Sequence, residues 1–540
     1  MEKKKLFEEF PPVSTQQWEE VINKDLKGAD YEKKLVWKTI DGIKVKPYFR
    51  QEHIEGKVYL ETFPGDFPYT RGVDVSNEWE IRQEIIIDSL ESANIKAVDA
   101  LNKGANAIAF STKNIIPESQ SQFSALLKGI NLEQHRIHFI TGSESLNLIK
   151  MLVQEITIQK LDKAKVCGSF TFDPIGYLCR KGKFYQNENV DFSSLKDAII
   201  LAKESLPGFR ILAISGNIFN NAGASVVQEL GYSLSVANEY VSRLTNAGLA
   251  AEDVLSQMHF TFAIGSSYFL EIAKLRAARM LFSGIASAYN CAENNASKIQ
   301  IHTVTSSWNK TMYDPYVNLL RTTTESMSAA IGGTSSHAVK PVDLCYKKSD
   351  DFSERIARNQ QIILKEESFL DKVVDPSSGS YYIENLTEAV AEESWRLFLE
   401  VESKSGFIAA FKTGNIQEEI TKTANQRDLN IATRKEILLG TNQFANQKEQ
   451  MSDKFILSNC LKKNQQSTDL IAQPLCQYRG AEAFEVLRLK TEKAPKTPKV
   501  FLLTIGNLAM RKARAGFASN FFACAGFSII DNIGFSTLDE

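Results

Sequence analysis

Between about residue 100 and residue 390, short apolar runs alternate with amphipathic stretches, and this alternation constrains the fold more than any other feature of the chain. It indicates βα units around a parallel sheet, and so an α/β fold. Eight units over about 290 residues fit a (β/α)8 TIM barrel, which usually has about 250 residues. The last two strands have the weakest patterns. The expected strands are Ala105–Phe110, Ile137–Ile140, Lys165–Phe170, Arg210–Ser215, Met258–Ala263, Ile299–Val304, Ser335–Val339 and Val373–Tyr382.

The clearest helix between these strands is Ser266–Tyr289. Its apolar stripe includes Phe269, Ile272 and Leu275, and a polar stripe carries three basic residues. Helical periodicity of this kind is typical of an amphipathic helix in a barrel wall. The polar stripe consists of Lys274, Arg276 and Arg279.

Charge and composition exclude several functional classes. The 540 residues have a formal net charge of -2 and no basic stripe, so the electrostatic footprint of a nucleic-acid or anionic-membrane binder is missing. No signal peptide or membrane-spanning apolar run is evident, which makes the cytoplasm the expected location. The seven cysteines are scattered without a CxxC pair, so neither a disulfide framework nor a metal site is expected.

The chain after the barrel falls into three parts. Residues 391–492 are expected to form a helical connecting region, and residues 493–499 combine prolines with charge as a linker does. Residues 500–540 predict a strand (Val500–Thr504), a helix (Leu508–Ala525) and a second strand (Phe527–Ile533). Such a βαβ unit cannot bury both faces of a parallel sheet. It is expected to be a truncated domain, a docked appendage or a partly ordered tail.

Four segments are long enough to be specific for a family. They are Pro64–Gly72 (PGDFPYTRG), Asp351–Asn359 (DFSERIARN), Asp375–Tyr382 (DPSSGSYY) and the loop Ser215–Ser225 (SGNIFNNAGAS) with its Ala-Gly-Ala. They resemble methylmalonyl-CoA mutases over nearly the whole chain, and this resemblance also supports the count of eight strands. Phe10-Pro-Pro-Val13, Trp18 and Lys24–Gly28 resemble the small, or beta, subunit of the heterodimeric bacterial enzymes.

The resemblance implies a (β/α)8 barrel, residues 35–390 with its lead-in, and a catalytic subunit that uses adenosylcobalamin to interconvert methylmalonyl-CoA and succinyl-CoA. The substrate-binding positions of that subunit are altered in this chain. Ile218 stands where a histidine would hydrogen-bond the thioester carbonyl, Thr171 replaces a glutamine, and Lys181 replaces an arginine that pairs with the substrate carboxylate. A sec-butyl group has no donor, and lysine lacks the bidentate fork of arginine.

Two further departures also remove groups that the catalytic subunit uses to bind its substrate. The tyrosine that follows Thr-Arg-Gly in the catalytic subunit is absent from the shorter segment Val73–Trp79, and Gln300 stands where an arginine would contact a CoA phosphate. Residues 500–540 resemble an incomplete, flavodoxin-like cobalamin domain. Its Asp-x-His-x-x-Gly motif is replaced by Leu508, Met510 and Ala513, so neither the imidazole that ligates cobalt nor its orienting aspartate is present. We expect no cofactor on this chain.

Some residues allow two interpretations. Glu354 and Arg358 are spaced as a helical pair, which favours helix stabilisation or subunit packing over ligand contact. His302 at a strand end is expected to be a hydrogen-bonded barrel histidine rather than a ligand. Asn217, Asn220 and Asn221 lie in a loop at the expected C-terminal mouth, where amides can bind but do not titrate. The large residues Phe170, Phe172, Ile218 and Phe219 suggest that side chains fill the barrel axis.

The favoured hypothesis is a non-catalytic small subunit that supports a catalytic large (alpha) subunit holding adenosylcobalamin. The family resemblance further implies that residues 1–34, with Trp18, form an arm that wraps this partner. Two alternatives remain open at this point. One is an independent acyl-CoA mutase variant that uses Thr171 and Lys181, and the other is a standalone homodimeric binding protein.

Overall fold

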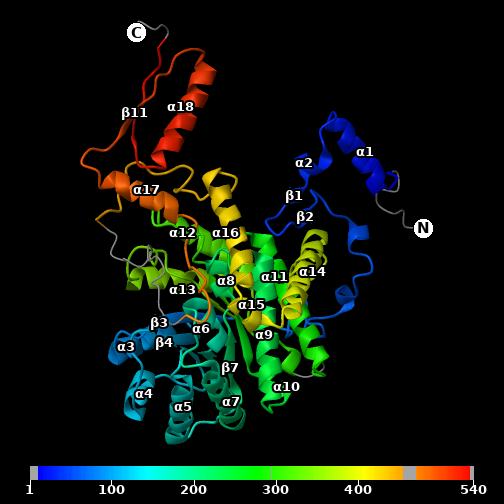
Figure 1. Cartoon of the computed structure of the whole chain (residues 1–540), viewed down its shortest axis with the longest axis vertical. Helices are drawn as coiled ribbons and strands as arrows, with labels where there is room; N and C mark the ends of the chain where they lie inside the picture. Colours follow the sequence, from blue (N-terminus) through cyan, green and yellow to red (C-terminus); the bar gives the residue numbers. More distant parts are fainter. Residues whose placement is uncertain (1–9, 293–294, 454–469, 536–540) are drawn as a thin grey trace, which may run out of the picture.

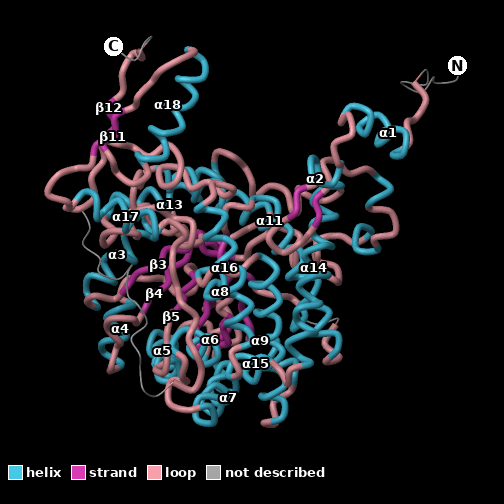
Figure 2. The backbone as a smooth tube through the Cα atoms, turned by 45° about the horizontal axis from the view of Figure 1, so that its top comes forward, coloured by secondary structure: helices cyan, strands magenta, loops and turns pink. Residues whose placement is uncertain are grey.

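The computed structural model describes residues 10–292, 295–453 and 470–535, and its centre is a closed barrel of eight parallel strands surrounded by helices (Figures 1 and 2). Each strand pairs with the next along the chain, and β10 closes the ring against β3. The (β/α)8 fold is therefore confirmed. The strands are β3 (Glu80–Ile86), β4 (Ala107–Ser111), β5 (Arg136–Ile140), β6 (Cys167–Phe172), β7 (Gly208–Ile214), β8 (Met258–Ile264), β9 (Ile301–Thr305) and β10 (Ser336–Ala338).

The helices that follow these strands form the outer layer of the barrel. Several begin with a side-chain cap, as where Ser225 accepts a hydrogen bond from the backbone of Gln228 and thereby satisfies a helix-end donor. These helices are α3 (Leu90–Asn102), α4 (Gln120–Leu127), α5 (Ser145–Gln159), α6 (Pro174–Lys181), α7 (Glu188–Ser205), α8 (Asn217–Asn221), α9 (Val226–Asn246), α10 (Ala251–Ser256), α11 (Tyr268–Ala288), α12 (Val317–Ile331) and α13 (Asp351–Glu366).

One strand of the barrel was assigned wrongly from the sequence. The first strand is β3 (Glu80–Ile86), and the expected eighth strand, Val373–Tyr382, is instead a turn that leads into α14 (Tyr381–Ser403). In β3, charged residues alternate with less polar ones, so it lacks the apolar run that marks its neighbours. Two of its inward-facing residues, Glu80 and Glu84, find partners: His138 lies 2.8 Å from Glu80, and Lys340 pairs with Glu84.

The main apolar core lies between the sheet and the helices, not along the barrel axis. Phe139 of β5 packs on Phe123 of α4 and on Phe170 of β6, with ring centroids 5.5 and 4.8 Å apart, and Phe170 also contacts Phe209. Phe172 contacts Tyr185 in the segment after α6. Because successive strand residues face opposite sides, the rings that meet the helices point away from the axis. The expectation that Phe170 and Phe172 fill the axis is therefore wrong.

The basic stripe of α11 is buried rather than exposed. Lys274 Nζ lies 2.7 Å from Glu229, and Arg276 forms ion pairs with Glu384 at 2.6 Å and with Asp375. Arg279 donates hydrogen bonds to backbone carbonyls of the lead-in, including Tyr69 O at 3.0 Å. The helix is covered on several sides by α9, α12 and α14, so these cations join layers of the fold instead of facing water.

Two parts of the chain extend away from the barrel. On one side lie α1 (Thr15–Asp25), α2 (Tyr31–Leu35) and a hairpin of β1 (Trp37–Lys38) and β2 (Lys44–Val45) (Figure 1). On the other side, α18 (Leu508–Ala523) packs on the parallel strands β11 (Lys499–Phe501) and β12 (Ser528–Ile530), as the sequence predicts. The connecting helices are α15 (Phe407–Lys412), α16 (Asn415–Ala432) and α17 (Glu482–Glu492).

Candidate functional site

The C-terminal mouth of the barrel is the natural place for a functional site, because the βα loops of such barrels converge there. Thr171 is half-buried on β6, Lys181 is exposed on the last turn of α6, and Ile218 is buried in α8 with 5% of its surface exposed. Neither Thr171 nor Lys181 makes a side-chain hydrogen bond or ion pair within the described ranges. The three residues come from neighbouring loops but form no polar constellation.

A segment of residues 470–480, which we term the strap, crosses this mouth. Its backbone donates hydrogen bonds to the connections that follow three strands of the barrel, β6, β7 and β9. After β6, Gly182 O accepts from Ile471 N at 2.9 Å and from Ala472 N at 3.1 Å. The remaining bonds run from Leu475 N to Cys179 O (2.8 Å), from Tyr478 N to Asn221 O (3.1 Å) and from Gly480 N to Trp308 O (2.9 Å).

The strap also covers the position of the expected histidine. Gln477 Nε2 donates to Ile218 O at 2.9 Å, so the loop after β7 is fixed from above. Close approach of strap and loop depends on residues without side chains, since a Cβ at Gly223 would lie 2.9 Å from Tyr478 Oη. Sequence patterns did not reveal this cover, because most of its contacts are backbone hydrogen bonds between distant segments.

A pocket of about 290 Å³ remains beside the strap, between the β1–β2 hairpin, the mouth loops and α16. Arg427 of α16 lies over the ring of Trp308, 3.3 Å from its centroid, and Ser306 Oγ donates to Asn220 Oδ1 at 2.7 Å. Burial raises the pKa of Asp41, at the hairpin turn, to about 6. The pocket can therefore form hydrogen bonds and change charge near neutral pH, but its asparagine does not titrate.

Polar side chains occupy the barrel axis below the mouth. His138 Nδ1 lies 2.8 Å from Ser169 Oγ, His302 Nδ1 lies 2.6 Å from Ser336 Oγ, and His259 donates to Phe170 O at 3.0 Å. His302 is thus a hydrogen-bonded barrel histidine, as expected. Burial lowers the pKa of His138 to about 4 and of His259 to about 3, and the pKa of His302 is lowered well below its ordinary value for the same reason. These imidazoles are neutral at pH 7.

The expected pair of Glu354 and Arg358 on α13 does not form. Glu354 binds Lys96 of α3 at 3.1 Å, and Arg358 donates to Gln83 of β3 at 2.7 Å. Each side chain thus ties α13 to the first βα unit, which supports a packing role.

The residues at the cobalamin-ligand positions do not fit that cofactor. Leu508 and Met510 are exposed in the first turn of α18, and Ala513 is exposed one turn later. An aliphatic chain, a thioether and a methyl group supply neither an imidazole ligand nor a carboxylate to orient one. Within the described ranges, no group of three or more His, Cys, Asp and Glu residues is placed to hold a metal ion. No helix in those ranges is long and apolar enough to cross a membrane.

Comparisons of the sequence with known proteins indicate one family. The family described as "Methylmalonyl-CoA mutase" matches residues 38–114 and 116–500. A methylmalonyl-CoA mutase small subunit of Porphyromonas gingivalis is 46% identical over all of this chain and 87% of its own length. A small subunit of Streptomyces virginiae is 30% identical over 96% of this chain and 83% of its own length. A methylmalonyl-CoA mutase of Cereibacter sphaeroides is 31% identical over 80% of this chain and 64% of its own length.

Proposed function

Because the chain belongs to the methylmalonyl-CoA mutase family, we propose that it is the small subunit of a heterodimeric mutase and does not itself perform catalysis. A large subunit would hold adenosylcobalamin and convert methylmalonyl-CoA to succinyl-CoA, and both subunits would work in the cytoplasm. The relatives named small subunits support this assignment, and one named a large subunit, from Streptomyces virginiae, is 27% identical to this chain.

The altered residues at the mouth, beneath a strap that binds the segments after β6, β7 and β9, are the observation that carries the proposal. Catalysis in such barrels takes place at the face where the strap lies. Here Ile218 is buried beneath Gln477 and offers no donor to a thioester carbonyl. Thr171 and Lys181 are not joined into a site, and the residues at positions 508, 510 and 513 cannot supply a cobalt ligand. A barrel without these parts keeps the shape of the family but not its reactive groups.

The N-terminal arm, residues 1–34, is the proposed contact with the large subunit. Residues 1–9 of the arm lie outside the described residues. In the remainder, neither α1 nor α2 buries a residue against the rest of the chain, and Val13, Trp18 and Val21 are exposed. Trp18 stacks on Tyr48 at 4.8 Å, which fixes an aromatic ring at the surface. Exposed, preorganised aromatic residues are frequent anchors of protein interfaces.

The test is co-expression of the chain with a tagged large mutase subunit, followed by the native mass of the retrieved complex. We expect a one-to-one complex, and retrieval of the large subunit alone would contradict the proposal. Deleting residues 1–34 should abolish retrieval while the barrel stays folded by circular dichroism. Trp18→Asp should weaken association, whereas Phe517→Asp, at a more exposed aromatic position on α18, serves as the control. Activity of the complex should reside in the large subunit.

A further inference from the structure

The wall of the barrel has a gap between β3 and β10. β10 pairs with β3 at only two positions, opposite Glu80 and Ile81, whereas β3 pairs with β4 from Arg82 through Ile86. The edge of β3 that faces β10 is therefore unpaired beyond Ile81. A pocket of about 510 Å³ occupies this gap, and residues from both faces of β3 line it, because it passes around the free strand edge.

Arg82 is the unusual residue of this pocket. It is only 5% exposed, and its side chain makes no hydrogen bond or ion pair within residues 10–292, 295–453 and 470–535. The nearby carboxylates of Glu84 and Glu80 are bonded to Lys340 and to His138 and Arg136 instead. Burial lowers the pKa of Arg82, although both carboxylates favour its charge. Its Nε is buried without an acceptor among the described residues, and such a buried donor is costly and rare in folded proteins.

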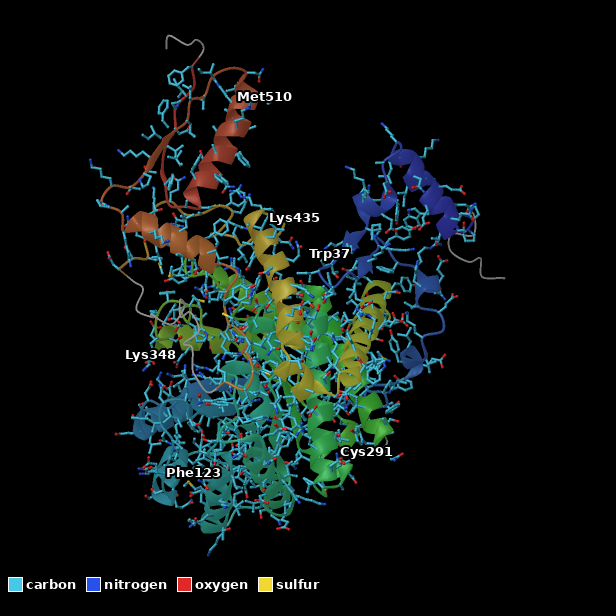
Figure 3. All side chains as sticks on the ribbon, in the orientation of Figure 1. Trp37, Phe123, Cys291, Lys348, Lys435 and Met510 are labelled. Carbon is cyan, nitrogen blue, oxygen red and sulfur yellow. The ribbon has the colours of Figure 1, made fainter. Side chains whose placement is uncertain are left out.

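The opposite wall supplies further unpartnered polar atoms and positive charge. Gln361 Oε1 and Ser349 Oγ are buried and make no hydrogen bond with any described residue. Seven cationic side chains and three carboxylates line the pocket, whereas the whole chain has a net charge of -2. Among the cations, Lys348 pairs with Asp88 at 2.5 Å and lies beside α13 (Figure 3), but Lys113 makes no ion pair with any described residue. The pocket is thus electropositive, with Arg82 and the Ser349 hydroxyl as donors that lack acceptors among the described residues, and with the Gln361 oxygen as an acceptor that lacks a donor there.

Apolar side chains complete the pocket. Its volume lies within the range of small-molecule sites, about 300 to 1,000 Å³. The exposed residues Ile86 and Leu344 lie at its apolar part, and water would otherwise cover them. The apolar lining consists of Ile85, Ile86, Val339, Pro341, Leu344 and Ala357.

We propose that this pocket binds a small organic anion. Its phosphate or carboxylate group accepts hydrogen bonds from Arg82, and the lysines of the rim add electrostatic attraction. Its apolar part packs on Ile86, Val339 and Leu344. The site lies where the gap in the barrel wall meets the axial cavity, which Arg82 also lines with His138 and His302. It does not depend on the proposed partner. Its occupant would supply an acceptor to Arg82, which has none among the described residues.

The test is isothermal titration calorimetry of the full chain with hexyl phosphate, hexanoate and hexanol, three probes that share an apolar body. We expect one-to-one binding of at least one anion and much weaker binding of the neutral alcohol. The stronger of the two anions identifies the head group. Equal binding of hexanol, or no binding of either anion, would overturn the proposal.

Variants locate the site. Arg82→Met should weaken binding of the anion about tenfold or more, as expected for loss of a charged hydrogen bond. Arg136→Gln is the matched control, because Arg136 lies on β5 outside this pocket and is already paired with Glu80 at 3.1 Å. If Arg82→Met does not fold, Ile86→Trp tests the site instead. Ile86 is exposed, so a tryptophan there should fill the pocket without disturbing the core and should block binding of the anion. Unchanged affinity in a folded Arg82→Met or Ile86→Trp protein would refute the site.

Discussion

Replacing Gly182 with alanine should detach the strap from the barrel. Gly182 ends α6 in the left-handed region, with φ +71°, and its carbonyl accepts the first two hydrogen bonds of the strap. An alanine Cβ would overlap Ala472 O and lie 2.9 Å from Leu470 Cδ2. Because the backbone of α6 is fixed by its own helix, the strap is the part that must move.

The magnitude follows from the bonds that the movement breaks. Two backbone hydrogen bonds contribute about 1 to 3 kcal/mol together, so the strap should open about 5 to 150 times more often. The left-handed conformation adds about 1 to 2 kcal/mol of strain for alanine, which lowers the global free energy of unfolding but does not act on the strap. The two effects are therefore separable.

Hydrogen exchange measured by mass spectrometry on peptides from residues 470–480 is the assay. Gly129→Ala is the matched control, because Gly129 has φ +77° and a Cβ there would meet nothing within 4 Å. Gly129→Ala should reduce global stability without changing exchange in the strap. Equal strap exchange in the two variants would show that Gly182 does not hold the strap, and that the closed mouth has another cause.

Three further outcomes are expected. Arg276→Met removes the cation between Asp375 and Glu384, so the free energy of unfolding measured in urea should fall by about 3 to 5 kcal/mol. Adding Asp375→Asn and Glu384→Gln to this variant should largely restore it. A decrease of less than about 1 kcal/mol would contradict the buried network. Ile218→His should yield no mutase activity with added adenosylcobalamin and should lower stability by about 1 to 3 kcal/mol, because the imidazole would be buried under the strap; measurable turnover would refute closure. The free energy of unfolding should fall as pH drops from about 6.5 toward 4, because burial lowers the pKa of His138 to about 4 and of His259 and His337 to about 3. In this range only the unfolded chain takes up these protons, and each histidine contributes up to about 1.4 kcal/mol per pH unit. A urea midpoint that is unchanged between pH 7 and pH 5 would contradict this.

Sequence patterns predicted most of the barrel because six of its strands are apolar runs. They failed for β3, where Glu80, Arg82 and Glu84 alternate with Ile81 and Ile85. The alternating charged residues of β3 face a polar barrel axis, and a single sequence does not show that this axis is polar. The sequence was also incomplete for α11, where the periodicity of Lys274 and its neighbours indicated a polar stripe but not that the stripe is buried. Burial of those cations depends on acidic partners from helices far away in the chain.

For the candidate site, the sequence showed which chemical groups are present at the expected positions, but not how those residues are arranged in space. Ile218, Met510 and their neighbours lack the groups that catalysis or cobalt ligation needs, whatever their surroundings. The strap could not be foreseen, because it lies about 260 positions from Ile218 in the chain and is held mainly by backbone hydrogen bonds, which leave no pattern in the sequence. Arg82 was missed for a related reason, since an arginine in a strand becomes unusual only when its burial and missing acceptor are known.

The aromatic row of Phe123, Phe139, Phe170 and Phe209 has a consequence for how such a chain can diverge. Because this row lies outside the sheet, the packing that holds the barrel closed does not depend on what occupies its interior. Substitutions of residues along the axis can therefore accumulate with little loss of packing between the sheet and the outer helices. An enzyme built in this way can lose its catalytic residues and still keep the outer surface that another protein binds.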